Sequence, residues 1–302
     1  MSTDNWSFCL DILRHMGHYD SMNKLPATKR AEILGMMAEG VSIRAIVRLT
    51  GASKNTVVKL LEDAGQAFTE YQDRAFRGLT CKRLQVDEIW SFVHCKQRNV
   101  ATAKAAPPQA GDIWTWTALD ADTKLIPSWL VSSRDADAAR FFISDLAARL
   151  ANRAQLTTDG HRPYLEAVEE AFGADIDYAM LIKMYGEGPA TAGRYSPGVC
   201  IGAEKRRVEG RPDPAHISTS YAERQNLSMR MGIRRFTRLT NAFSKKAENH
   251  ALAVAIYFMH YNFVRIHQTL RCTPAMAAAV TTKLWELSDL VKVLKDWEAA
   301  RE

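Results

Sequence analysis

The sequence predicts an α/β protein with one mixed five-stranded sheet and flanking helices, preceded by a small all-α domain. Three observations predict this fold class. The chain has 302 residues, 47% of them apolar, which is enough for one large domain and one small one. Before Cys81 the apolar residues recur with a helical period, and after it they form runs typical of strands. The later order of strands and helices is typical of an α/β sheet.

Three short helices are predicted near the start of the chain. Glycine ends place them over residues 27–40, 42–51 and 53–65, and serine N-caps begin the second and the third. The turn between the last two has the length that a helix-turn-helix needs, and the last helix of that motif contacts DNA. Its candidate DNA-binding side chains are Lys54, Asn55, Thr56 and Lys59. A small helical bundle without a ligand is the structural alternative.

The large domain follows a linker. Its strands are predicted over residues 83–93, 112–120, 124–133, 154–159 and 175–185. A short turn joins the second strand to the third and favours an antiparallel hairpin. Helices are predicted over residues 135–152 and 163–172, so the order is three strands, helix, strand, helix, strand. This order predicts one mixed sheet.

The domain boundaries are predicted where these patterns change. The predicted parts are a poorly ordered extension (1–23), a helix-turn-helix domain (24–65), a linker helix (66–82), a catalytic domain (83–280) and a C-terminal amphipathic helix (281–302). The catalytic domain contains a glycine- and proline-rich insertion over residues 184–217. Because that insertion is longer than most loops of a compact domain, it indicates a functional flap or substrate loop.

The composition limits the classes of function. The formal net charge is +6 and the isoelectric point is near 9.0, which permits a polyanionic partner without demanding one. Basic residues outnumber acidic ones between Ala203 and His250, so this stretch is the candidate nucleic-acid surface. The five cysteines include no C-x-x-C pair, and therefore no zinc finger is indicated. The longest apolar run, residues 251–264, is too short to span a bilayer, and we expect a cytoplasmic protein without a membrane partner.

Three acidic residues are candidates for a metal site. Asp87 lies inside the first strand, Asp159 ends the fourth, and Glu223 lies in the first turn of the helix after the fifth. An aspartate in a central strand is costly to bury unless something compensates its charge. A divalent cation would do so, and oxygen ligands without nearby His or Cys favour Mg²⁺ or Mn²⁺. The structural alternatives are a capping box between Ser220 and Glu223, and a turn role for Asp159.

Glu88 is an alternative to Asp87. Neighbouring side chains on a strand point to opposite faces of the sheet, so only one of the two is expected to face a cation. Asp87 is favoured, because a short carboxylate suits a ligand fixed on a strand.

The helix that starts near Glu223 is predicted to place an acid beside bases. Residues three or four apart share one face of a helix, so Glu223, Asn226 and Arg230 form a stripe that Arg234 continues. The candidate DNA-binding residues of this stretch are Asn226, Arg230, Arg234, Arg235 and Arg238. A solvated charged face is the alternative for each arginine.

Four segments together resemble one protein family. They are QVDEIWSF, TTDGHRPY, YAERQNLSMRMGIRRFTRLTNAFSK and YNFVRIHQTLRCTP, and they are similar to bacterial insertion-sequence DDE transposases, in particular the insertion-sequence-one type. The resemblance covers residues 24–280 and implies an RNase H-like core shared with retroviral integrases. It implies a catalytic triad of Asp87, Asp159 and Glu223 that holds two metal ions. Arg230 matches the basic residue that these proteins carry two turns after the glutamate. Many relatives also have an N-terminal cysteine zinc finger, which is missing here.

The resemblance also implies a function. A DNA transposase would use Mg²⁺ or Mn²⁺ to cleave DNA at the ends of an insertion sequence and then transfer the 3′-hydroxyl strand into target DNA. The implied partners are double-stranded DNA, as element ends and as target, and further copies of the chain in a homo-oligomer associated with a bacterial nucleoid. The alternatives are a non-catalytic helix-turn-helix regulator and an RNase H-like nuclease with the same metal site.

Overall fold

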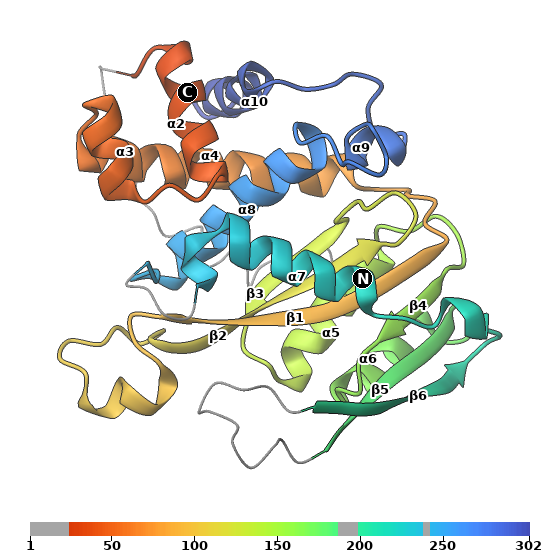
Figure 1. Ribbon diagram of the computed structural model, residues 1–302. Coiled ribbons are helices and arrows are strands. Elements are labelled where there is room, and N and C mark those ends of the chain that lie inside the picture. Colours follow the sequence, from red (N-terminus) through yellow and green to blue (C-terminus); the bar gives the residue numbers. More distant parts are fainter. Residues whose placement is uncertain (1–23, 187–198, 238–241) are drawn as a thin grey trace.

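A six-stranded mixed sheet forms the centre of the computed structural model, which describes residues 24–186, 199–237 and 242–302 (Figure 1). The strand order is β3-β2-β1-β4-β5-β6. The strands are β1 (Arg83–Val93), β2 (Gly111–Asp120), β3 (Ser128–Ser132), β4 (Gln155–Thr158), β5 (Asp177–Gly186) and β6 (Val199–Glu209). β4 is parallel to β1 and β5, and the other pairs are antiparallel. The predicted mixed α/β class is confirmed.

The predicted count of five strands is wrong, because β6 lies within the stretch expected to be a loop-rich insertion. β6 pairs with β5 from Tyr178 opposite Glu209 to Gly186 opposite Val199. Every residue of β6 is at least partly exposed, so its sequence lacks the alternation of apolar and polar residues that reveals a half-buried strand. A short 3-10 helix, η2 (Pro214–His216), follows. The remaining part of the insertion, residues 187–198, lies outside the described residues.

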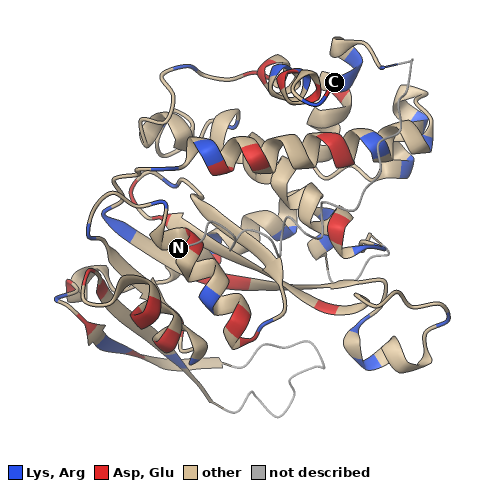
Figure 2. Cartoon of the chain, turned by 180° about the vertical axis from the view of Figure 1, so that it is seen from behind, with Lys and Arg blue, Asp and Glu red and all other residues tan. Residues whose placement is uncertain are grey.

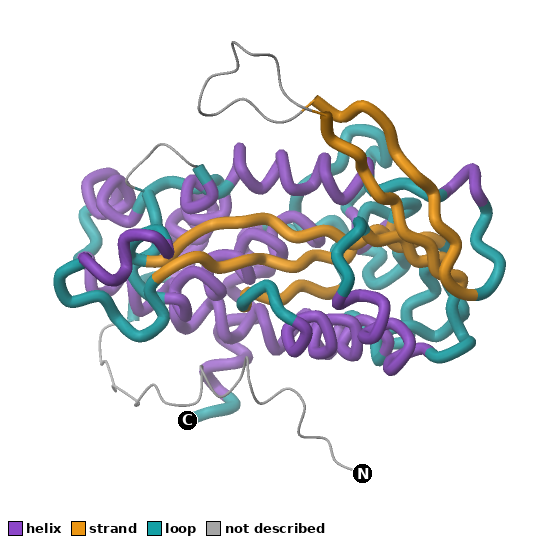
Figure 3. The backbone as a smooth tube through the Cα atoms, turned by 90° about the horizontal axis from the view of Figure 1, so that it is seen from below, coloured by secondary structure: helices purple, strands orange, loops and turns teal. Residues whose placement is uncertain are grey.

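Helices cover both faces of the sheet. α5 (Ala136–Ala147) and α6 (Pro163–Phe172) pack together on one face, and α7 (Ser220–Gly232) and α8 (Ala247–Phe263) lie on the other. The two layers are visible on either side of the strands in Figures 1 and 3. Two 3-10 helices, η1 (Gln97–Thr102) and η3 (Arg234–Phe236), connect elements at the edges.

A further layer of helices packs on the outside of α8. It contains α2 (Ala27–Ala38), α3 (Ile43–Thr50), α4 (Lys54–Ala75) and α10 (Leu287–Ala299), and the short α9 (Pro274–Ala277) contacts α8. Ser42 and Ser53 accept hydrogen bonds from Ala45 and Thr56 as N-caps, and Gly51 ends α3 with φ of 70°. These predicted caps are confirmed. The predicted C-terminal helix is shorter than residues 281–302, and it packs on α2 and α4.

The predicted helix end at Gly65 is wrong, because α4 continues through it to Ala75. Gly65 has a contact role: a Cβ atom there would lie 2.6 Å from Leu252 Cβ and 2.9 Å from Leu252 Cα on α8. A glycine therefore lets two helix backbones approach closely. Of the residues expected to form a separate linker helix (66–82), those up to Ala75 are the second half of α4, and residues 76–82 connect it to β1.

The main apolar cluster joins the helical layer to the sheet. It runs from Ile33 in α2 through Phe68 in α4 and Met259 in α8 to Val86 in β1, and it includes Leu290 in α10. The segment predicted to be a helix-turn-helix and the sheet thus share one core, which fixes the helical layer against the rest of the chain. In the part of the chain that the structure describes, no helix has the length and apolar character needed to cross a membrane.

Candidate active site

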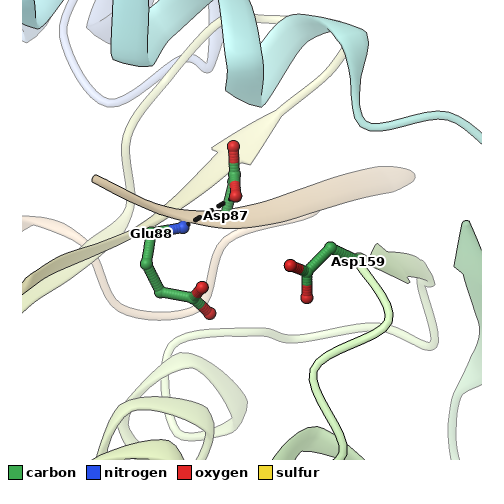
Figure 4. Close-up of side chains that lie close together, drawn as sticks. All are labelled: Asp87, Glu88 and Asp159. Carbon is green, nitrogen blue, oxygen red and sulfur yellow. Dashed lines mark hydrogen bonds between the residues drawn. The ribbon is translucent and has the colours of Figure 1, made fainter. Parts of the chain in front are cut away.

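Asp87 lies in the middle of the sheet, on β1. Its Oδ1 accepts a hydrogen bond from the Glu88 backbone N–H at 2.9 Å, and its Oδ2 accepts one from Asn226 Nδ2 on α7 at 2.8 Å. In Figure 4 its carboxylate points from the strand toward α7. Because two donors hold it, the orientation of this carboxylate is fixed by the strand and the helix together.

Asp159, predicted as the last residue of the fourth strand, lies directly after the last residue of β4, Thr158. The parallel pairing of β1 and β4 sets Gln85 opposite Thr157, so Asp87 and Asp159, two residues further along each strand, lie side by side. Asp159 Oδ1 accepts a hydrogen bond from the His161 backbone N–H at 2.9 Å. The register of two parallel strands therefore brings these two acids together.

Glu88 joins the two aspartates from below the strand. The side chains of Asp87 and Glu88 leave opposite sides of β1, as the pleat requires (Figure 4). Glu88 is long enough to turn back, and one carboxylate oxygen from each of Asp87, Glu88 and Asp159 lies within 4.8 Å of the other two. The pleat therefore separates the two side chains as expected, while the length of Glu88 brings its carboxylate close to the aspartates; which of the two binds a cation stays a prediction.

The Glu88 carboxylate is already engaged inside the protein. It accepts hydrogen bonds from the Tyr164 hydroxyl and from Arg134, whose Nη2 lies 3.1 Å from Glu88 Oε2. Its side chain is 1% exposed. Arg134 also stacks on the Trp114 ring, 5.0 Å from its centroid, and its Nη2 lies 3.5 Å from Asp159 Oδ2. Glu88 is thus a buried carboxylate with its own counter-charge.

Glu223 lies in the first turn of α7, as predicted. The capping-box alternative is wrong, because the N-cap is Thr219 rather than Ser220 and its side chain caps no backbone group. Instead, the Thr219 hydroxyl donates to Glu223 Oε1, and Lys183 Nζ on β5 lies 2.5 Å from Glu223 Oε2. Glu223 is therefore committed to other side chains and does not contribute to the helix cap.

A cavity of about 700 Å³ brings the predicted acids together. Its lining includes Asp87, Asp159 and Glu223, with the basic side chains of Arg134 and Lys183 on its walls. A site that combines carboxylates with flanking positive charges can hold a divalent cation next to an anionic substrate.

Burial and mutual repulsion perturb the carboxylates. Burial raises the pKa of Asp87 to about 7, and the negative charges of Asp159 and Glu223 add to the effect. Burial also raises the pKa of Glu88 to about 7, and the charge of Asp159 contributes. A bound cation would stabilise the ionised form of these carboxylates, because attraction to the cation would replace the repulsion between them.

The predicted stripe on α7 is only partly present. Asn226 is buried and donates to Asp87, so it positions a carboxylate instead of facing DNA. Arg230 Nη1 lies 3.5 Å from the Phe236 carbonyl oxygen. α7 ends at Gly232, so Arg234 and Arg235 lie on η3, where Arg234 is exposed.

Arg235, by contrast, donates to Ser244 Oγ at 2.6 Å, and burial lowers its pKa to about 10. Its guanidinium thus lies inside the protein instead of on a DNA-facing surface. Arg238 lies outside the described residues.

The helix-turn-helix residues lie at the far end of the helical layer. Lys54, Asn55 and Lys59 are exposed and Thr56 is half-buried, and Lys59 pairs with Asp63 at 2.9 Å. Figure 2 shows basic positions gathered on α3 and the start of α4. These residues are accessible to a partner, while their role in DNA binding stays a prediction.

Sequence reasoning missed Lys183, Arg134 and Tyr164. Lys183 lies near the end of a strand, and Arg134 precedes α5 in a run of small and charged residues. Neither position breaks a pattern in the way that an aspartate inside an apolar strand does. Only the sheet order, which places β5 beside β4, brings Lys183 to the acids.

The comparisons with known proteins leave the family open. No protein-family model matches the chain, and no curated protein sequence matches it either. Among solved structures, it is similar to the cryo-EM structure of a piggyBac transposase synaptic complex with hairpin DNA. That similarity covers 98% of this chain and 77% of the other, with 9% sequence identity and a TM-score of 0.35. So low a TM-score carries no argument about function.

Proposed function

We propose that the chain is a DDE transposase that uses divalent cations to cleave DNA at insertion-sequence ends and to join the 3′-hydroxyl to target DNA. One observation carries this proposal. Asp87 on β1 and Asp159, directly after the parallel strand β4, line one cavity, and Glu223 lines it from α7. The three acids predicted from separate segments thus share one site.

The residues present fit a divalent cation. All the candidate ligands are carboxylate oxygens, which suit Mg²⁺ or Mn²⁺, and a cation would relieve the repulsion that helps to raise the pKa of Asp87. In the proposal, Asp87, Asp159 and Glu223 would hold two metal ions. Bound there, the ions would stabilise the attacking and leaving oxygens of an in-line displacement at phosphorus.

The chain's own residues prepare the site. Asn226 orients the Asp87 carboxylate, and the His161 backbone N–H orients that of Asp159. In this proposal the exposed face of α4 selects the DNA, while Arg230 and Arg234 hold the strand to be cut. The transposase would act as a homo-oligomer on paired element ends, within the bacterial nucleoid.

Three single variants test the proposal. Asp87→Asn, Asp159→Asn and Glu223→Gln should each lower Mg²⁺-dependent cleavage and strand joining by about 100-fold or more, because each removes a charged ligand. DNA binding should persist in all three. Asp175→Asn is the matched control, since Asp175 is 83% exposed and pairs only with Arg153 at 3.8 Å among the described residues.

The same assay separates the alternatives. Cleavage without joining would indicate a nuclease, and salt-sensitive DNA binding without any metal-dependent cleavage would indicate a regulator. A residue whose variant keeps near wild-type activity is not a metal ligand.

A further inference from the structure

Lys183 is a basic residue inside the cavity whose contact conflicts with metal binding. It lies on β5 opposite Ala203 of β6, and its Nζ lies 2.5 Å from Glu223 Oε2. Among residues 24–186, 199–237 and 242–302, Glu223 is its hydrogen-bonding partner. The two side chains are 31% and 39% exposed, so the pair faces the solvent-filled cavity instead of the core.

The fold does not depend on this ion pair. The start of α7 is held by Gln85 Oε1 on β1, which accepts hydrogen bonds from the Tyr221 and Ala222 backbone N–H groups at 2.8 and 3.2 Å. Ala222 and Met229, on the inner side of α7, are fully buried. A partly exposed ion pair contributes little beside these contacts. Lys183 is therefore not explained as a support for α7.

A cation on Glu223 would compete with Lys183 for the same carboxylate. Thr219 donates to Oε1 and Lys183 lies on Oε2, so both oxygens already have a partner. A divalent cation bound to this carboxylate would repel the nearby Lys183 ammonium and weaken its ion pair. The other acids on the cavity wall, Asp87 and Asp159, would be bound to the cation as well. An ammonium displaced from Glu223 would then be attracted to an anion from outside the chain.

Arg134, which also lines the cavity, has a partner outside the proposed ligands. It is anchored to Glu88 by contacts of 3.1 and 3.2 Å and stacked on Trp114, and its contact with Asp159 is longer, at 3.5 Å. The Glu88 side chain is 1% exposed and is not a ligand in the proposed function, so Arg134 would keep this counter-charge when a cation binds Asp159. Between Lys183 and Arg134, Lys183 is therefore the one that would change partner.

We propose that Lys183 exchanges Glu223 for a phosphate group of the bound DNA strand when a divalent cation occupies the carboxylates. The identity of the anion rests on the proposed function, because a phosphodiester is the anion that such a site receives. A lysine ammonium on a flexible stem suits this exchange, since it can rotate toward a phosphate oxygen without any backbone movement. The exchange also means that DNA and cation favour each other's binding.

The salt dependence of DNA binding tests the exchange. Binding of a DNA duplex is measured over a range of salt concentrations, once with a chelator and once with Ca²⁺, which occupies carboxylate sites. One phosphate contact adds about 0.9 to the slope of log affinity against log salt. Wild type and Lys183→Gln should share a slope in chelator, and wild type should be steeper by about 0.9 in Ca²⁺. Lys183→Met, which retains the apolar stem, should behave like Lys183→Gln.

Lys205→Gln is the control, because Lys205 lies on β6 outside the cavity lining and bonds the Pro214 carbonyl at 2.6 Å. Lys205→Gln should change the slope of log affinity against log salt by the same amount with and without Ca²⁺. Equal slopes for wild type and Lys183→Gln in Ca²⁺ would overturn the exchange. A decrease in the slope of equal size with chelator and with Ca²⁺ for Lys183→Gln would also overturn the exchange, because Lys183 would then contact DNA regardless of the cation.

Calorimetric titration of the DNA-free protein with Mn²⁺ gives a second readout. Lys183→Gln should bind Mn²⁺ about 2- to 5-fold more tightly than wild type, since the cation no longer displaces an ion pair. Unchanged or weaker binding contradicts the proposal. Neither readout needs catalysis. If both behave as expected while Mg²⁺ supports no cleavage, the proposed transposase activity fails and the partner exchange stands.

Discussion

At the scale of single residues, the site contains more carboxylates than a triad needs. Asp87, Glu88 and Asp159 form the tight cluster, whereas Glu223 lines the same cavity from another element. The hydrogen-bonding partners divide them into two groups. Glu88 is held by a buried tyrosine and an arginine, while Asp87, Asp159 and Glu223 face the open cavity. This division indicates different roles for the two glutamates.

Glu88→Gln and Glu223→Gln should therefore have different effects. Glu223→Gln should weaken Mn²⁺ binding by about 10- to 100-fold and leave stability nearly unchanged. Glu88→Gln should have the smaller effect on Mn²⁺ binding and should cost about 1–3 kcal/mol of stability, because Arg134 loses a buried charged acceptor. Calorimetric Mn²⁺ titration and urea unfolding measure the two quantities. If Glu88→Gln weakens Mn²⁺ binding as much as Glu223→Gln, then Glu88 is a ligand.

At the scale of elements, the packing of α4 against α8 joins the helical layer to the rest of the protein. Beyond the close approach at Gly65, Gln72 donates to the Ala255 carbonyl and Phe76 stacks on Phe263 with ring centroids 5.6 Å apart. The contact therefore extends along both helices. Its tightest point is the glycine, which leaves no room for a side chain.

Gly65→Ala should destabilise the protein by about 1–3 kcal/mol, since the added methyl group collides with the Leu252 backbone. This loss should exceed the gain of about 1 kcal/mol that alanine brings to a helix interior. Urea unfolding measures the change.

Gly35→Ala in α2 is the matched control, because the added Cβ would meet only the flexible end of Leu287. It should change stability by less than about 1 kcal/mol or increase it. A Gly65→Ala protein as stable as wild type would mean that α4 and α8 can move apart at no cost.

The sequence predicted the elements that carry a repeating pattern. The bounds of β1 and α6 match the structure, because alternating or helical apolar residues define them. Asp87 and Asp159 could be predicted as well, since an acid within or directly after an apolar strand is unusual. β6 could not, because neither of its faces is buried, and Gly65 could not, because a contact with α8 has no local signal. Lys183 and Arg134 depend on sheet order, which a one-dimensional pattern does not contain.

At the scale of the whole molecule, two basic regions lie on different layers. The first turn of α4 presents Lys54 and Asn55 at the end of the helical layer, and Arg230 and Arg234 lie at the end of α7 and on η3. A shared core fixes the two layers in one body. In the proposed function, one region reads the sequence of the DNA and the other holds the strand at the carboxylates.

Asn55→Ala should reduce the preference for the element's own ends over random duplex by about 5- to 100-fold, because base-edge contacts discriminate sequence. Arg230→Ala should depress cleavage at saturating DNA with little change in that preference. Competition binding at fixed salt measures the first effect and a cleavage assay the second. Lys292→Ala, on the exposed side of α10, is the charge-removal control. An unaltered preference in Asn55→Ala would leave the three-helix segment as a packing surface.

The packing of α4 against α8 and α10 has a consequence for the order in which the protein is made. A ribosome produces α2, α3 and α4 before Leu252 and Met259 on α8 and Leu290 on α10, which cover their apolar side. The apolar surfaces of the three nascent helices therefore stay uncovered until α8 and α10 emerge. An incomplete translation product that ends before α8 would lack this cover, and we expect it to aggregate or be degraded.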